Sequence, residues 1–171
     1  MAERYEKSYI AIPIKESPLA DWIQNLNGEK KFLHMTFYFL GRIGKRKLLE
    51  IKDTVLKVSS NLSGVELKPK QLAIIGEGNK SFVVLLEETQ KLKDARHIFE
   101  TELSDFRDKN LPFSPHVTIK NLSFRDLSSG NFDKYMATPD KSKALDSFSA
   151  TSIGVFYRTE DVTALLFSKK L

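Results

Sequence analysis

Two segments of this chain repeat a histidine and a threonine two residues apart: His34 and Thr36 recur 82 positions later as His116 and Thr118. Side chains two apart on a β-strand point to the same face, so each segment would present an imidazole beside a hydroxyl. With 9 threonines in 171 residues, a chance threonine at this spacing from two of the three histidines has a probability on the order of 1%. The repeat therefore predicts one site built from two strands.

Two histidines can divide into one acid and one base at pH 7, because the unperturbed pKa of the imidazole is close to neutrality. A threonine hydroxyl can donate a hydrogen bond to an anionic oxygen. Two imidazoles and two hydroxyls would surround a tetrahedral anion and favour a phosphodiester, where one histidine activates water and the other protonates the leaving oxygen. Phosphoryl transfer depends mainly on positioning and charge stabilisation, so this chemistry requires no metal and no cofactor.

Two other interpretations apply to the same residues. A single His-x-Thr on a strand is more often a half-buried histidine beside a β-branched neighbour. A zinc site needs three or four protein ligands, and no third His or Cys is placed to join His34 and His116. The third histidine, His97, falls inside a predicted helix, and we interpret it as structural or solvent-facing.

The two-residue period separates the faces of the two His-x-Thr strands. In the first, Leu33, Met35, Phe37 and Phe39 share one face, and His34, Thr36 and Tyr38 share the other. In the second, Val117 and Ile119 oppose His116, Thr118 and Lys120. The pattern therefore predicts that Tyr38 and Lys120 face the same site as the histidines.

The other elements follow from periodicity and from turn residues. Further strands are expected over 7–14, 65–68, 71–75, 82–86, 147–157 and 162–168, and helices from Ser17-Pro18 to Asn27-Gly28 and over 45–60, 89–108 and 128–137. Strands and helices mix without regular alternation, and hairpins are frequent. This order predicts one α+β domain over residues 1–171, with two sheets flanked by helices and two pseudo-symmetric lobes around a central cleft.

Composition limits the class of protein. The 27 Lys and Arg residues exceed the 22 Asp and Glu residues, which gives a net charge of +5 and mildly favours a polyanionic partner such as RNA. The absence of cysteine excludes disulfides and thiolate metal sites. No apolar run approaches the roughly 20 residues of a membrane-spanning helix, and the N-terminus does not resemble a signal peptide. We therefore expect a cytoplasmic protein without a membrane or obligate protein partner, and a monomer.

Both repeated segments resemble the signatures of a known family, the 2H phosphoesterases. The stretch from His34 to Gly41 is similar to His-x-Thr-Leu-x-Phe-Leu-Gly, with Phe37 where leucine is usual. The stretch from Ser114 to Ile119 is similar to Pro-His-[Val/Ile]-Thr-Leu. The opening Tyr9-Ile10-Ala11-Ile12-Pro13 resembles the first strand of the branch that contains the RNA 2′,3′-cyclic phosphodiesterases, also called 2′-5′ RNA ligase-like proteins.

The resemblance implies a bilobal fold of two antiparallel sheets and a metal-independent hydrolase. Its substrates would be RNA ends or nucleotides with a 2′,3′-cyclic phosphate, opened to 2′-phosphomonoesters, with 2′-5′ RNA ligation as the reverse reaction. Carried onto this chain, His34 would be the proton donor to the departing 3′-oxygen and His116 the proton acceptor that activates water. Thr36 and Thr118 would hold the phosphate oxygens. The order of acid and base comes from the family alone.

The chain departs from the family pattern after the second signature, where an arginine is common and Lys120 and Asn121 stand here. Lys120 can supply the missing charge, and Tyr157 and Tyr38 can stack on a base. These three residues are the expected substrate contacts. Other functions of the same fold stay open: a phosphodiesterase for 2′-5′ oligonucleotides or small cyclic nucleotides, or a non-catalytic basic RNA-binding module.

Overall fold

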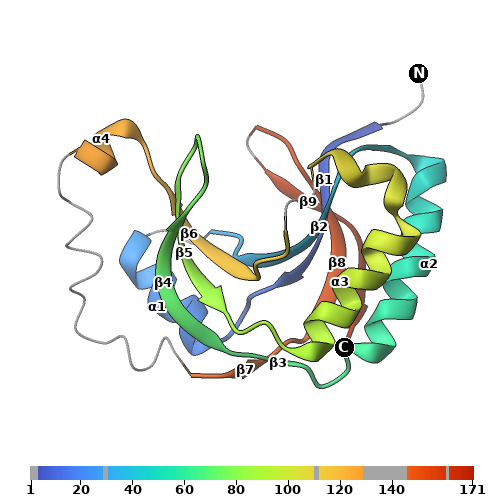
Figure 1. The fold of residues 1–171 in the computed structure, drawn as a ribbon, viewed down its shortest axis with the longest axis horizontal. Helices are drawn as coiled ribbons and strands as arrows, with labels where there is room; N and C mark the ends of the chain where they lie inside the picture. The colour runs from blue at the N-terminus through green and yellow to red at the C-terminus, as the bar shows by residue number, and fades with distance from the viewer. Residues whose placement is uncertain (1–3, 29–30, 110–111, 129–145, 161) are drawn as a thin grey trace.

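The structure is a computed structural model that describes residues 4–28, 31–109, 112–128, 146–160 and 162–171 (Figure 1). Its elements, in chain order, are β1 (Arg4–Pro13), α1 (Pro18–Asn27), β2 (His34–Gly44), α2 (Lys45–Asn61), β3 (Glu66–Leu67), β4 (Pro69–Ile75), β5 (Ser81–Leu86), α3 (Gln90–Glu102), the 3₁₀ helix η1 (Ser104–Lys109), β6 (His116–Asn121), α4 (Phe124–Ser128), β7 (Phe148–Ser149), β8 (Ser152–Arg158) and β9 (Thr163–Lys170).

Seven of the strands form one antiparallel sheet in the order β4-β5-β6-β2-β1-β8-β9, and β3 pairs with β7 in a small second sheet. The predicted α+β class is confirmed. The two strands with the His-x-Thr pairs, β2 and β6, are neighbours in the middle of the large sheet, but a single residue pair, Met35 with Val117, joins them. The sheet therefore consists of two halves, β4-β5-β6 and β2-β1-β8-β9, that meet at the repeated motif.

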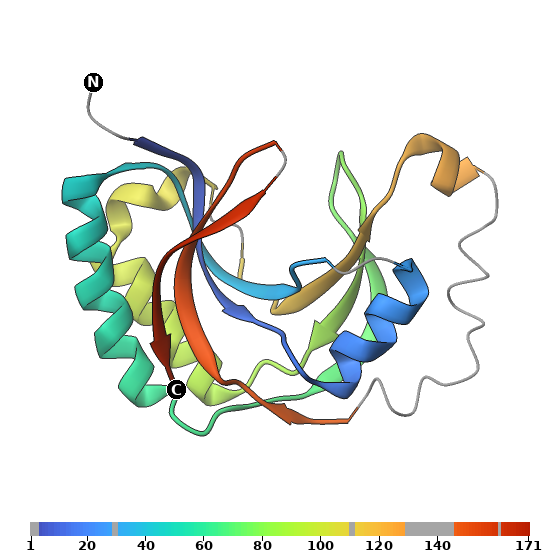
Figure 2. The same cartoon turned by 180° about the vertical axis from the view of Figure 1, so that it is seen from behind.

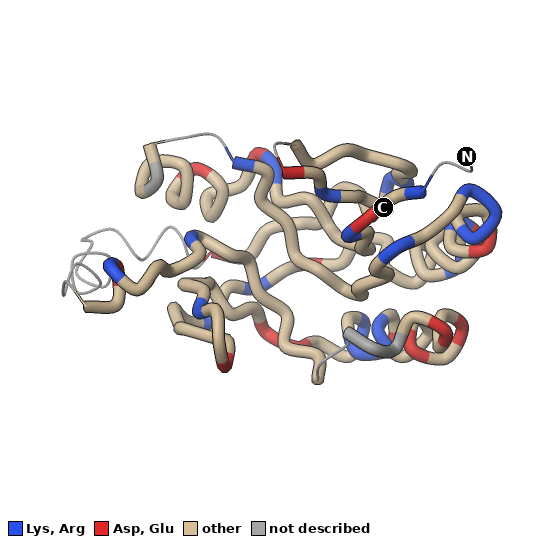
Figure 3. Tube along the Cα trace, turned by 90° about the horizontal axis from the view of Figure 1, so that it is seen from above, with Lys and Arg blue, Asp and Glu red and all other residues tan. Residues whose placement is uncertain are grey.

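Helices cover the two halves from outside. Helices α2 and α3 lie side by side against the β2-β1-β8-β9 half, and α1 lies by the β4-β5-β6 half (Figures 1 and 2). One continuous cluster of buried apolar side chains joins these layers. Charged residues lie mostly on the outer helices and loops, and the central strands are largely uncharged (Figure 3).

Local signals set the ends of α1 as the sequence predicts. The Ser17 hydroxyl accepts a hydrogen bond from the Ala20 backbone N–H at 3.1 Å, and Pro18 occupies the first turn. Gly28 ends the helix in a left-handed conformation, φ +66°, that favours glycine.

Two predicted elements differ from the structure. The helix expected over 89–108 is divided into α3, which ends at Glu102, and the 3₁₀ helix η1. Leu103 between them is not helical, and its carbonyl accepts a hydrogen bond from the Tyr38 hydroxyl. The strand expected over 147–157 is divided into β7 and β8, since the chain passes from the small sheet to the large one at Ala150. Helix α4 precedes the short helix expected over 128–137 and was not predicted, and residues 129–137 lie outside the described residues.

None of the helices in the described part of the chain is long and apolar enough to cross a bilayer.

Candidate active site

A β-bulge in β2 decides which side chains face the cleft. Ile10 of β1 pairs with Tyr38, but the next residue, Ala11, pairs with Thr36, so Phe37 is an extra residue. Such an insertion reverses the alternation of the side chains beyond it. Tyr38 is fully buried, and its hydroxyl donates to the Leu103 carbonyl at 3.0 Å. The prediction that Tyr38 shares the face of His34 is therefore wrong.

Phe39 takes the place expected for Tyr38. It is 47% exposed and lines the same pocket as His34 and Thr36, although the two-residue period assigns it to the apolar face. The sequence carries no signal of the bulge, because the insertion is defined only against the partner strand.

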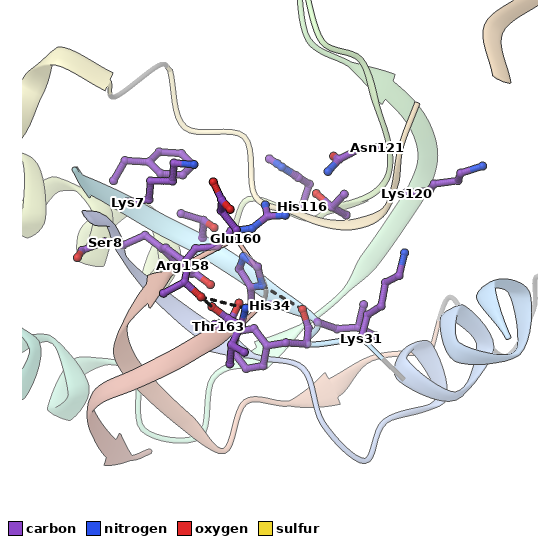
Figure 4. A pocket seen from close by; sticks show the side chains of 18 of the residues that line it. Lys7, Ser8, Lys31, His34, His116, Lys120, Asn121, Arg158, Glu160 and Thr163 are labelled. Carbon is purple, nitrogen blue, oxygen red and sulfur yellow. Dashed lines mark hydrogen bonds between the residues drawn. The ribbon is translucent and has the colours of Figure 1, made fainter. Parts of the chain in front are cut away.

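The four residues of the repeat line one cleft of about 680 Å³. His34 and Thr36 come from β2, and His116 and Thr118 from β6. Figure 4 shows the two imidazoles extending into the pocket from their separate strands. The predicted convergence of the two motifs is thus what the structure shows, in a cleft of the size that usually holds a small ligand.

The two histidines are held in the same way. Nδ1 of His34 lies 3.3 Å from the Phe32 carbonyl oxygen, and Nδ1 of His116 lies 2.7 Å from the Ser114 carbonyl oxygen. A carbonyl only accepts, so Nδ1 carries the hydrogen in both rings and Nε2 is left for proton transfer. Each motif thus sets the tautomer of its histidine through the residue two positions earlier.

His34 packs against two aromatic rings. Its ring centroid is 4.9 Å from that of Tyr9 and 5.1 Å from that of Phe32, with interplanar angles of 30° and 22°. Phe156 packs behind both of these rings. This burial lowers the pKa of His34 to about 4, with smaller contributions from the charges of His116 and Arg158, against the hydrogen bond to Phe32, which raises it.

The two threonines are the natural contacts for an anion between the histidines. Thr36 and Thr118 are half-buried and line the pocket. Neither hydroxyl hydrogen-bonds to another residue that the structure describes, so both can donate to a ligand. Within the same described ranges, no three His, Cys, Asp or Glu side chains are grouped to hold a metal ion.

Lys120 does not share the face of His116. A register shift in β6 places Phe82 opposite Lys120 and Val83 opposite Thr118, so Ile119 is an extra residue. Lys120 lies at the pocket edge and extends away from His116 (Figure 4), and its ammonium is 2.7 Å from Asp126 Oδ1. This ammonium and hydrogen bonds from Ser123 hold the pKa of Asp126 well below its usual range. Lys120 thus has a carboxylate partner already, and the expected face is corrected.

Asn121 lies above His116 in Figure 4 and accepts a hydrogen bond from the Ser81 hydroxyl at 2.9 Å. The bulge at Ile119 therefore presents an amide to the pocket where the two-residue period predicts an ammonium.

Tyr157 is not among the residues that line the pocket. Its ring packs 5.2 Å from that of Tyr5, on the face of β8 opposite to Phe156 and Arg158. The expected contact between Tyr157 and substrate is therefore not what the structure shows.

Sequence reasoning missed three cations that line the pocket: Lys7 on β1, Lys31 before β2 and Arg158 at the end of β8. Lys7 and Arg158 lie on one side of His34 and Lys31 on another (Figure 4). Glu160 is the acidic residue that lines the pocket within the described residues. The cleft is therefore predominantly positive, although no spacing in the sequence distinguishes these cations from those of the outer surface.

No family model matches this chain, and no curated protein matches it by sequence. Solved structures match it over nearly its whole length. E. coli LigT complexed with 3′-AMP has a TM-score of 0.62 and 17% identity, over 99% of each chain. The protein TT0787 of Thermus thermophilus has a TM-score of 0.68 and 13% identity, over 96% of this chain and 97% of that one.

This chain has the 2H phosphoesterase fold. Kluyveromyces marxianus Usb1 is a more distant match, with a TM-score of 0.54 and 11% identity over 95% of this chain and 98% of that one. The 2H phosphoesterase fold thus covers the chain from β1 to β9, and the His-x-Thr pairs occupy the two strands where its halves meet.

Proposed function

We propose that this protein hydrolyses 2′,3′-cyclic phosphates at RNA ends to 2′-phosphomonoesters without a metal ion. The convergence of His34, Thr36, His116 and Thr118 in one positive cleft carries the proposal. Support also comes from the structural likeness to LigT, which has been crystallised with 3′-AMP, with ATP and with phosphate.

The reaction needs one proton removed and one proton delivered. Nε2 of His116 takes a proton from water, and the water oxygen forms a bond to phosphorus. The bond from phosphorus to the 3′-oxygen breaks, and Nε2 of His34 protonates that oxygen. Hydrogen bonds from the Thr36 and Thr118 hydroxyls stabilise the charge that develops on the other phosphate oxygens.

As the proton donor, His34 must gain a proton when substrate binds. With a pKa of about 4, its imidazolium is on the order of 0.1% populated in the free protein at pH 7. An anionic phosphate beside the ring favours the charged form and raises the pKa. The aromatic rings around His34 thus keep its imidazole neutral when the site is empty, and a bound phosphate makes the imidazole charged.

Phe39 offers the base a stacking surface in the same cleft, since its ring is exposed and lies on the strand of His34 and Thr36. Base–aromatic stacking of this kind contributes about 1–3 kcal/mol per base and tolerates any base.

Product analysis tests the proposal. We expect the protein, in excess EDTA, to convert adenosine 2′,3′-cyclic phosphate to the 2′-monophosphate, identified by chromatography against both monophosphate standards. His34→Gln and His116→Gln each remove one proton-transfer group and are expected to lower kcat by about 10²-fold or more. His97→Gln is the matched control, because His97 is exposed on α3.

Three outcomes contradict the proposal: an intact substrate, a 3′-monophosphate product, or undiminished rates in both variants. Parallel reactions with a 2′-5′-linked oligoadenylate and a small cyclic nucleotide distinguish the other phosphodiesterase functions. Binding of RNA that survives His34→Gln and His116→Gln together, without turnover of any substrate, identifies a non-catalytic module.

A further inference from the structure

Lys7 has an unusual backbone conformation for its residue type. Its φ is +50°, in the left-handed region that non-glycine residues rarely adopt. It lies in a bulge of β1, where Tyr5 pairs with Ile43 and Ser8 with Gly41, so two residues of β1 oppose one of β2. Backbone strain of this kind is concentrated at functional sites.

The bulge directs the side chains of Glu6 and Lys7 to different sides of β1. Glu6 turns outward and forms an ion pair with Arg42 at 2.7 Å, whereas Lys7 lines the cleft. The Ser8 hydroxyl donates to the Tyr5 carbonyl at 3.1 Å and closes the bulge. The lysine is therefore held at the cleft by the backbone, and its own acidic neighbour is directed elsewhere.

Arg158 is the neighbour of Lys7 across the sheet. Ser8 pairs with Tyr157, and Lys7 and Arg158 follow one position beyond this pair on β1 and β8. The turn after Arg158 is fixed by Thr159, whose backbone N–H and hydroxyl both donate to the Val162 carbonyl, at 2.9 and 3.0 Å. Arg158 lines the same pocket as His34 and Lys7, and Figure 4 shows both cations on one side of the imidazole.

Glu160 lines the same cleft as these two cations and lies on their side of it in Figure 4, but it forms no ion pair with either of them. Among the residues that the structure describes, no carboxylate lies within ion-pair distance of Lys7 or Arg158. Such partners are present for the cations Arg42, Lys47, Lys57, Lys68, Arg96 and Lys120. Lys7 and Arg158 lie on neighbouring strands of one cleft and have no ion-pair partner among the residues described there, and a phosphate between them would offset their mutual repulsion.

We propose that Lys7 and Arg158 form a second phosphate subsite, for the phosphodiester that joins the terminal nucleotide to the rest of an RNA chain. The inference rests on the proposed function and adds that chains are preferred to mononucleotides. A 5′-terminal phosphate and an internal phosphodiester would both place a phosphate on the 5′ side of the terminal nucleoside. We propose that the subsite binds the internal phosphodiester.

Three substrates test the subsite: adenosine 2′,3′-cyclic phosphate, the same nucleotide with a 5′-phosphate, and the dinucleotide ApA with a 2′,3′-cyclic end. We expect kcat/KM for the dinucleotide to exceed that for the first substrate about tenfold, as one charge-assisted contact provides. Lys7→Gln is expected to bring this ratio close to one, and Lys7→Arg to restore it. Lys93→Gln, the same charge change on the exposed side of α3, is expected to leave it unchanged.

The subsite is refuted if the ratio of kcat/KM between dinucleotide and mononucleotide is the same in the wild type and in Lys7→Gln. It is also refuted if Lys93→Gln lowers this ratio as much as Lys7→Gln does. If the 5′-phosphate raises kcat/KM as much as the second nucleotide of the dinucleotide does, a terminal phosphate is sufficient. The preference for an internal phosphodiester is then refuted.

A binding measurement separates failure of the subsite from failure of the proposed function. The probe is fluorescein-labelled tetra-adenylate with a 2′-phosphate end, followed by anisotropy at several salt concentrations. We expect Lys7→Gln to weaken binding about tenfold and to reduce the salt slope by about 0.7. This result in a protein without turnover supports the subsite and refutes the hydrolase. Unchanged affinity and slope in a protein with full turnover refute the subsite alone.

Discussion

Lowering the pH should destabilise this protein through His34. The pKa of His34 is about 4 in the folded protein and 6.5 in the unfolded chain. Between these values the unfolded chain binds a proton that the folded protein does not, so stability is complete above pH 6.5 and is lost as the pH falls toward 4. Each pKa unit corresponds to about 1.4 kcal/mol, so the full loss is about 3 kcal/mol, of which about 2 kcal/mol is reached at pH 5.

Urea unfolding followed by the fluorescence of Trp22, the single tryptophan, measures this loss at pH 8 and pH 5. We expect His34→Gln, which cannot titrate, to lose about 2 kcal/mol less than the wild type between these pH values. His97→Gln, on an exposed position, should behave as the wild type. Equal losses in the wild type and His34→Gln would refute the reasoning, because the titration would then belong to other groups.

NMR titration gives the same quantity directly, since the chain has only three histidines. One imidazole resonance should titrate near pH 4 and disappear in His34→Gln. Phe32→Leu removes one of the stacked rings and should move this midpoint toward 6.5, because it admits water to the imidazole. Inorganic phosphate should move it in the same direction. If neither Phe32→Leu nor inorganic phosphate moves the titration midpoint of His34, the proposed role of the aromatic rings is contradicted.

Three further substitutions test the packing of the large sheet and the stacking surface in the cleft. Tyr38→Phe should destabilise the protein by about 1 kcal/mol in urea unfolding, through the lost hydrogen bond to Leu103, and leave KM unchanged. Phe39→Leu should raise KM for a cyclic nucleotide about tenfold and leave urea stability nearly unchanged, since this ring is exposed; an unchanged KM contradicts stacking. Gly154→Ala should destabilise by about 1–3 kcal/mol in the same assay, because the new Cβ would lie 2.7 Å from a backbone oxygen of β9 and 3.0 Å from the Phe156 ring.

Several features of this protein could be predicted from residues close together in the chain. Ser17, Pro18 and Gly28 set the ends of α1 through local hydrogen bonds and backbone preferences, which act whatever the rest of the fold does. The two His-x-Thr pairs are equally local, because two residues on one strand face share a direction in any sheet. Their recurrence was enough to predict a two-stranded site, and with the family signatures to predict the fold.

Tertiary structure alone decided what surrounds those pairs. The two-residue period extends reliably only to the first bulge, and each bulge is defined by the register with a partner strand that the local sequence does not specify. The extra residue in β2 buries Tyr38 and places Phe39 in the cleft. The extra residue in β6 directs Lys120 toward Asp126 and places Asn121 in the cleft. The positive end of the cleft likewise exists only because β8 returns beside β1, which brings Arg158 next to a lysine more than a hundred residues earlier.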